Sequence, residues 1–143
     1  MLYQEFYSEL GKLLYAVADF DGTITKKEKR TLYEIVRKKL VPSEKHKDEF
    51  GTDVAYYVGM EFDYCDEENS DPEIAFSSFI DFVEEHHTAF DAKLKKVCLL
   101  APLELEKANH KTNKVKKLLI RRLKNEIDKI YPQVKTIKKV ALL

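Results

Sequence analysis

The stretch that decides the fold runs from residue 13 to residue 28 and reads LLYAVADFDGTITKKE. Its first part continues an apolar pattern that recurs every three or four residues from the N-terminus, at Leu2, Phe6, Leu10, Leu13, Leu14 and Val17. This spacing gathers apolar side chains on one face of a helix, whereas a β-strand would alternate every second residue. The sequence therefore predicts a helix that leads directly into an acidic, glycine-containing turn.

A second helix is expected to begin just after this turn. Thr25 and Glu28 have the spacing of a capping box, in which each side chain bonds the backbone N–H of the other residue. An apolar pattern continues as far as Leu40, and Pro42 is expected to end the helix. Within the turn, Gly22 suits a left-handed backbone conformation.

Helical spacing recurs through the rest of the chain. Further helices are expected over about 52–66, 72–90, 94–105 and 115–130. Asp71 and Pro72 form a typical helix start, while Pro102 is expected to kink or split its helix. Four glycines and four prolines favour long helices with short connections. The prediction is an all-α fold: a single bundle of about six or seven helices over residues 1–131, with a short tail at 132–143.

Composition indicates one globular domain in a reducing compartment. The length of 143 residues suits one core. Cys65 and Cys98 are far apart and lack a Cys-x-x-Cys spacing, so reduced thiols are expected. No apolar run approaches the roughly 20 residues of a membrane span. The N-terminus also lacks a signal-peptide pattern, so a cytoplasmic protein is expected.

Charge is strongly segregated although the net charge is zero. Residues 43–91 contain fifteen acidic and two basic side chains, whereas residues 107–143 contain twelve basic and two acidic ones. Such segments can attract each other within the fold or face different partners. The basic side chains of the last helix are expected to form a solvated face: Lys111, Lys114, Lys116, Lys117, Arg121, Arg122 and Lys124. Few aromatic residues accompany them, so nucleic acid is not expected, and the alternative partners are an acidic protein surface or an anionic membrane surface.

The acidic turn allows three interpretations. Asp-x-Asp-Gly-Thr resembles the nucleophile motif of haloacid-dehalogenase phosphatases, with Asp19 as nucleophile and Asp21 as general acid and base. That mechanism needs a buried parallel strand, which the helical pattern before Asp19 excludes. No other nucleophile and base are paired in the sequence, so no catalysis is expected.

The second interpretation is a calcium loop. If Gly22 is position 6 of an EF-hand, Glu28 falls at position 12, while Asp19 and Asp21 fall at positions 3 and 5. Position 1 would be Val17, which has no ligand atom, so a weak site is expected. The third interpretation has no metal: the turn is held by hydrogen bonds from backbone N–H groups to the two aspartates.

Residues 14–28 also resemble the TerB-like domain of tellurite-resistance proteins. The shared features are an alanine-rich helix end, an Asp-x-Asp-Gly turn, a β-branched residue, and a glutamate that opens the next helix. The resemblance extends to the helical N-terminal domain of DjlA-type co-chaperones. It implies an all-helical, stress-associated protein whose acidic turn binds a divalent cation (calcium, manganese or zinc), with Asp19, Asp21 and Glu28 as ligands. The second acidic turn of the family has no counterpart at residues 109–112.

The histidines and the remaining acids are weaker candidates. Glu84 and His87 have the spacing of a di-iron motif, but no second motif accompanies them. His86 is expected at the edge of the core, and the acids between Asp63 and Asp71 are expected in a solvated loop. Two hypotheses about function follow. One is a TerB-like accessory protein with a weak cation site that acts through an unidentified protein partner. The other is a metal-free interaction module with acidic and basic faces.

Overall fold

The computed structural model describes residues 2–108 and 114–130, and the all-α prediction is confirmed over these ranges. The main helices are α1 (Leu2–Asp19), α2 (Lys26–Ile35), α4 (Tyr57–Glu67), α5 (Pro72–Glu85), α6 (Ala92–Glu106) and α7 (Lys114–Ile130). Short helical segments join them: η1 (Val36–Leu40), α3 (Val41–Ser43), η2 (Val54–Tyr56) and η3 (His87–Ala89). The described residues contain no β-strand, only an isolated bridge between Lys47 and Asp53.

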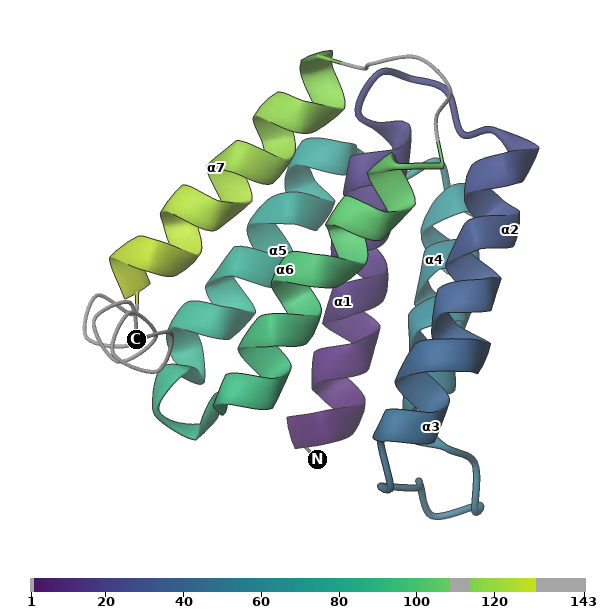
Figure 1. Ribbon diagram of the computed structural model, residues 1–143, viewed down its shortest axis with the longest axis vertical. Helices are drawn as coiled ribbons and strands as arrows, with labels where there is room; N and C mark the ends of the chain where they lie inside the picture. Colours follow the sequence, from purple (N-terminus) through teal and green to yellow (C-terminus); the bar gives the residue numbers. More distant parts are fainter. Residues whose placement is uncertain (1, 109–113, 131–143) are drawn as a thin grey trace.

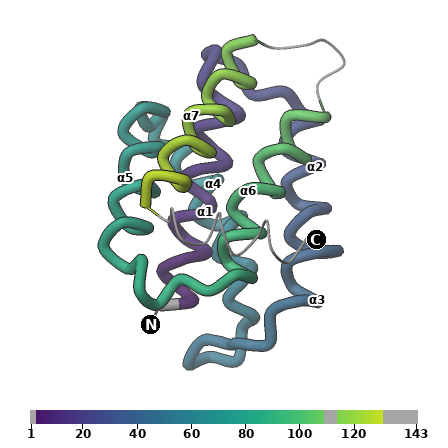
Figure 2. Tube along the Cα trace, turned by 60° about the vertical axis from the view of Figure 1, so that its left-hand side comes forward, coloured from purple at the N-terminus to yellow at the C-terminus, as the bar shows by residue number. Residues whose placement is uncertain are grey.

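Helix α1 is the centre of the bundle. It packs against α4, α5 and α6, and it lies between the α2–α4 side and the α5–α7 side (Figures 1 and 2). Residues 13–18 are consecutive and each is at most 1% exposed. The sequence predicts an apolar stripe on one face, but this part of α1 is buried on every face because neighbouring helices surround it.

Gly11 allows α1 and α4 to approach closely. A Cβ atom at this position would lie 2.5 Å from the carbonyl oxygen of Val58 and 2.9 Å from the Cβ of Glu61. These distances leave no room for a methyl group between the two backbones. The absence of a side chain at Gly11 therefore determines how closely α4 packs against the central helix.

Several predicted helix ends are confirmed. Thr25 and Glu28 form the capping box of α2, and Asp71 caps α5 with Pro72 in the first turn. The helix that begins at α2 continues through the π-helical turn η1 into α3, with Pro42 in its last turn. Pro102 does not split its helix, because α6 runs unbroken to Glu106.

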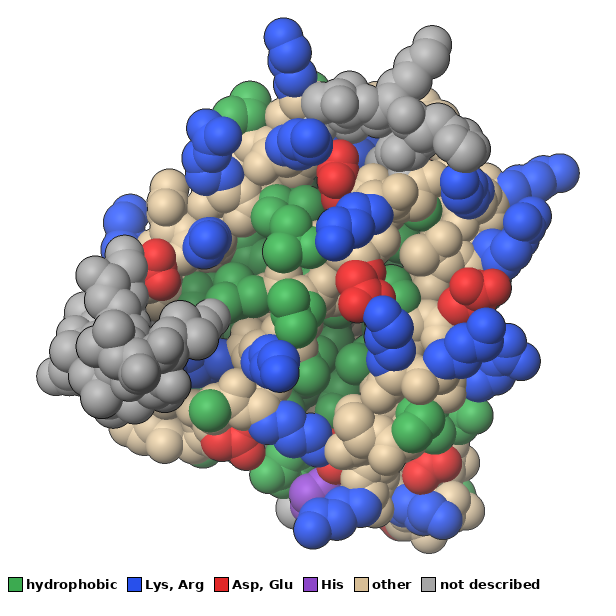
Figure 3. Space-filling view, viewed as in Figure 1, with side chains coloured by type: hydrophobic (Ala, Val, Ile, Leu, Met, Phe, Trp, Pro, Cys, Tyr) green, Lys and Arg blue, Asp and Glu red, His purple; other side chains and the backbone are tan. Residues whose placement is uncertain are grey.

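The surface view shows where charge gathers. Lys and Arg side chains are spread over α7 and along the outer side of α2 (Figure 3). Both cysteines are buried free thiols, as predicted. In the described ranges no helix has the length and apolar character needed to cross a membrane. The predictions for residues 109–112 and for the tail at 132–143 lie outside the described part of the chain.

Candidate functional site

The acidic turn between α1 and α2 is held by its own hydrogen bonds. Gly22 has a φ of 85°, and its N–H donates to the carbonyl oxygen of Asp19 at 2.8 Å. The N–H of Thr23 donates to Oδ1 of Asp21 at 3.1 Å. Thr25 then opens α2 by accepting from the N–H of Glu28 at 3.0 Å. This bonding needs no metal ion, as expected for an aspartate- and glycine-containing turn.

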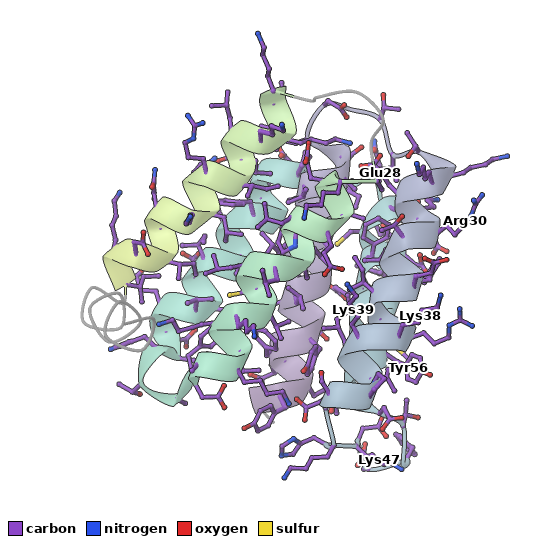
Figure 4. All side chains as sticks on the ribbon, viewed as in Figure 1. Glu28, Arg30, Lys38, Lys39, Lys47 and Tyr56 are labelled. Carbon is purple, nitrogen blue, oxygen red and sulfur yellow. The ribbon has the colours of Figure 1, made fainter. Side chains whose placement is uncertain are left out.

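Glu28 is fully buried and uses both of its carboxylate oxygens. Its Oε1 accepts from the N–H of Thr25 at 3.0 Å, and its Oε2 accepts from Nζ of Lys116 at 2.7 Å. The side chains of Lys116 and Glu28 are only 2% and 0% exposed. Figure 4 shows Glu28 on the inner side of α2 and Arg30 on its outer side. Glu28 thus caps α2 and binds α7 at the same time.

The ammonium group of Lys116 also reaches the turn itself. Its Nζ lies 3.7 Å from Oδ1 of Asp21. Two of the three predicted metal ligands therefore face one positive charge that the chain supplies, at the place where a bound cation would balance them. A buried carboxylate needs such a partner because its desolvation is costly.

Asp19, the third predicted ligand, takes its hydrogen bond from α1, and Lys116 attracts it electrostatically as well. Its Oδ2 accepts from the hydroxyl of Tyr15 at 3.1 Å. The same hydroxyl lies 2.6 Å from the carbonyl oxygen of Ser70, so it also tethers the loop before α5. Burial raises the pKa of Asp19, and nearby Asp66 and Asp21 add to the rise, while the hydrogen bond from Tyr15 opposes it.

The structure thus brings Asp21 and Glu28 together around Lys116 and leaves Asp19 with Tyr15. Among the described residues, no group of three His, Cys, Asp or Glu side chains is arranged to hold a metal ion. Cation binding by Asp19, Asp21 and Glu28 stays a prediction, and so does the identity of the cation. A metal would have to compete with a buried ammonium group for two of its three ligands.

Comparison of the chain with protein-family models, with curated proteins and with solved structures gives no match. The TerB-like resemblance of residues 14–28 and its stress-related function therefore stay predictions. The function has to be argued from the geometry of the chain itself.

A second buried carboxylate lies at the other end of the bundle. Glu44 follows α3, and its Oε1 accepts from the hydroxyl of Tyr7 at 2.8 Å. Its Oε2 accepts from the backbone N–H of His46 at 3.1 Å and lies 2.5 Å from Nδ1 of that ring. Lys93 contributes a longer contact of 3.5 Å. Burial alone would raise the pKa of Glu44, but the bonds from His46 and Tyr7 outweigh it and lower that pKa to about 2.

A groove on the surface lies between α2–η1 and α4. This groove has a volume of ≈ 620 Å³ and its lining includes Arg30, Tyr33, Arg37, Tyr56, Gly59 and Met60. Three of its large side chains are well exposed: Tyr33 at 45%, Tyr56 at 40% and Met60 at 54%. Exposed aromatic and methionine side chains beside arginine are typical of protein-binding surfaces.

The prediction of a solvated basic face was wrong for Lys116, because this side chain is buried. The available signal is spacing: Lys116 precedes Leu119, Leu123 and Ile127 at the same three- and four-residue intervals, so it continues the buried stripe of α7. Val115 and Leu118, which were assigned to that stripe, are 42% and 58% exposed.

Two other predictions concern α4 and α5. Asp63 and Asp66 lie within α4, inside the helix expected over about 52–66, and both are half-buried, so they do not belong to a solvated loop. Asp66 pairs with Lys29 at 2.6 Å, and Asp63 accepts a hydrogen bond from Tyr33. His86 is half-buried and packs beside Phe82 at 4.6 Å between ring centroids, as expected for a residue at the edge of the core.

Proposed function

We propose that this chain is a non-catalytic, metal-free protein-interaction module. The observation that carries the proposal is the position of the Lys116 ammonium group, 2.7 Å from Glu28 and 3.7 Å from Asp21. Lys116 offsets part of the negative charge of the acidic turn within the fold and ties α2 to α7, so we take the turn to be a structural joint. A cation entering there would have to separate the buried Lys116 ammonium group from the carboxylate of Glu28, and breaking a buried ion pair is costly.

The distribution of the other charges supports a role in binding. Some segregated charges pair inside the fold: Arg122 of the basic region binds Glu73 of the acidic region at 2.6 Å. Other charged side chains are exposed to solvent. Arg30 and Arg37 are exposed and have no ion pair among the described residues. Exposed, unpaired arginines contribute to the rate and specificity of association more than to fold stability.

Calorimetric titration with calcium, manganese and zinc tests the metal-free part of this proposal. We expect no saturable heat from the wild-type protein, and an unchanged melting temperature after treatment with a chelator. The Asp19→Ala/Asp21→Ala double variant is the control. Saturable heat that disappears in this variant would contradict the proposal and support the TerB-like cation site.

Hydrolysis of a chromogenic phosphoester in the presence of magnesium tests the non-catalytic part. We expect no turnover above the buffer rate. Turnover that is lost in Asp19→Asn would support the phosphatase interpretation of the same turn and overturn the proposal.

A further inference from the structure

We propose that the groove between α2–η1 and α4 is the docking surface of this module, and that it binds an acidic polypeptide segment that carries apolar side chains. This inference rests on the proposed function, because it names the surface and the partner of the interaction module. Three features carry it: the shape of the groove floor, the exposed apolar side chains, and the charge of the α2 rim.

Gly59 is part of the groove lining and lies beside the ring of Tyr33. A Cβ atom at position 59 would meet the ring of Tyr33 at 3.4 Å. The hydroxyl of Tyr33 bonds Asp63, and burial together with this bond raises the pKa of Tyr33 to about 12. The ring is thus fixed by a bond to α4 at one end and by its own helix α2 at the other. A fixed aromatic surface loses little conformational entropy when a partner binds.

The exposed side chains supply apolar contact area. Tyr56 and Met60 lie one turn apart on the α4 side of the groove, and each is at least 40% exposed. Tyr56 is 40% exposed, so part of its ring is available to a partner. Aromatic and methionine side chains are enriched at protein interfaces because they bury much area per residue.

A tight hairpin extends this apolar surface beyond the groove. Thr52 lines the groove, and its N–H donates to Oδ1 of Asp48 at 2.9 Å. The N–H of Phe50 donates to the same oxygen at 2.9 Å, which holds the turn rigid. Phe50, at the tip, is 82% exposed. A rigid hairpin therefore presents an unshielded aromatic ring next to the end of the groove.

The charge on the α2 side of the groove indicates the class of partner. Arg30 and Arg37 stand seven residues apart, two helical turns, along the α2 side. Lys26 and Lys38 are exposed on the same segment and also lack an ion pair in the described residues, while Glu34 is its only exposed acid. The α2 rim is therefore positive, which favours a partner with carboxylates at matching positions.

A polypeptide fits this surface better than a nucleic acid. The groove lining includes Glu34 and Asp63, which would repel a continuous phosphate backbone. A polypeptide can place its carboxylates opposite Arg30 and Arg37 and its apolar side chains opposite Tyr56 and Met60. Because the basic and the apolar side chains occupy separate parts of this surface, the expected partner is a polypeptide segment that carries both acidic and apolar side chains.

Selection from a random displayed-peptide library against the full-length protein tests this inference. The Arg30→Glu/Arg37→Glu variant serves for counter-selection, and circular dichroism checks that it is folded. We expect enriched peptides that are rich in Asp and Glu and contain aromatic or aliphatic residues. Binding of an enriched peptide should weaken about tenfold or more in the variant, which corresponds to about 1.4 kcal/mol. The Met60→Ser variant should weaken the same peptide without altering the charge of the rim.

The matched control is Arg121→Glu/Lys124→Glu, which makes the same charge change on the exposed face of α7. It should change the affinity less than about twofold. Enrichment of basic peptides, equal loss in both double variants, or no enrichment would overturn the inference. The inference would also be overturned if single-stranded RNA bound the groove more tightly than the enriched peptides do. If peptide binding persists but needs a divalent cation, the metal-free proposal fails while the groove assignment stands.

Discussion

The two ends of the bundle each bury a glutamate, but they neutralise it in different ways. At one end, Glu28 faces Lys116, whose side chain is only 2% exposed. At the other end, Glu44 receives hydrogen bonds from Tyr7 and His46, and its basic neighbours are more than 40% exposed. The first carboxylate depends on one buried charge, and the second depends on several hydrogen-bond donors at the edge of the solvent.

This difference shows how one residue type can serve two purposes. An ion pair that is buried on both sides is little screened by salt but fails when either partner is lost. A carboxylate held by several donors tolerates the loss of one of them, but it responds to acid because its pKa is displaced. The acidic turn belongs to the first kind, which makes it a structural joint, whereas the Glu44 end is expected to be the acid-sensitive part of the fold.

Loss of Lys116 should have the largest effect. The variant Lys116→Met leaves Glu28 buried without a counter-charge and should lower the free energy of unfolding by about 3–5 kcal/mol. The corresponding variant at the other end, Lys93→Met, should cost less than about 1 kcal/mol because Lys93 is exposed. Urea denaturation measures both.

The double variant Lys116→Met/Glu28→Gln sharpens this test. A glutamine at position 28 can still complete the capping box while it carries no charge. The double variant should therefore be more stable than Lys116→Met alone. Equal costs for Lys116→Met and Lys93→Met would show that the two ends do not differ as described.

The second-largest loss of stability is expected from acid, which acts on the Glu44 end of the bundle. The pKa of Glu44 is lowered to about 2 in the fold, whereas an unfolded glutamate titrates at about 4.3. The contribution of Glu44 is thus complete above about pH 5 and is lost as the pH falls toward 2. Denaturation at several pH values should show a loss of about 2 kcal/mol that Glu44→Gln reduces. If Glu28→Gln flattens this acid dependence more than Glu44→Gln, the comparison is wrong.

Removal of the Tyr7 hydroxyl should have a smaller effect than loss of Lys116 or of the Glu44 charge. Tyr7→Phe deletes the hydroxyl that donates to Glu44 at 2.8 Å but keeps the buried ring. Because His46 still donates, the cost should be about 1–2 kcal/mol in thermal or urea unfolding. A cost as large as that of Lys116→Met would mean that Tyr7 alone holds this carboxylate.

Local patterns in the sequence predict the elements of this fold well. The spacing at Leu10, Leu13 and Leu14 gives the first helix, and the Thr25–Glu28 box gives the start of the second. Both rest on interactions within a few residues along the chain. The complete burial of residues 13–18 was not predicted, because it depends on which helices surround α1.

Contacts between distant segments explain what the sequence missed. The capping role of Glu28 is local, but its partner Lys116 is 88 residues away and only the packing of α7 brings them together. The groove likewise depends on how α4 packs against α2, through contacts between distant segments such as the hydrogen bond from Tyr33 to Asp63. A periodic pattern identifies a buried face but not the face that covers it.

The enclosure of α1 also has a consequence for how the protein fluctuates. Amide hydrogens in a central helix exchange with solvent only when the surrounding helices separate, which requires opening of the whole domain. The backbone amides of residues 13–18 should therefore be the slowest to take up deuterium, at a rate set by global unfolding. Their exchange would give the stability of the whole domain from a single short segment.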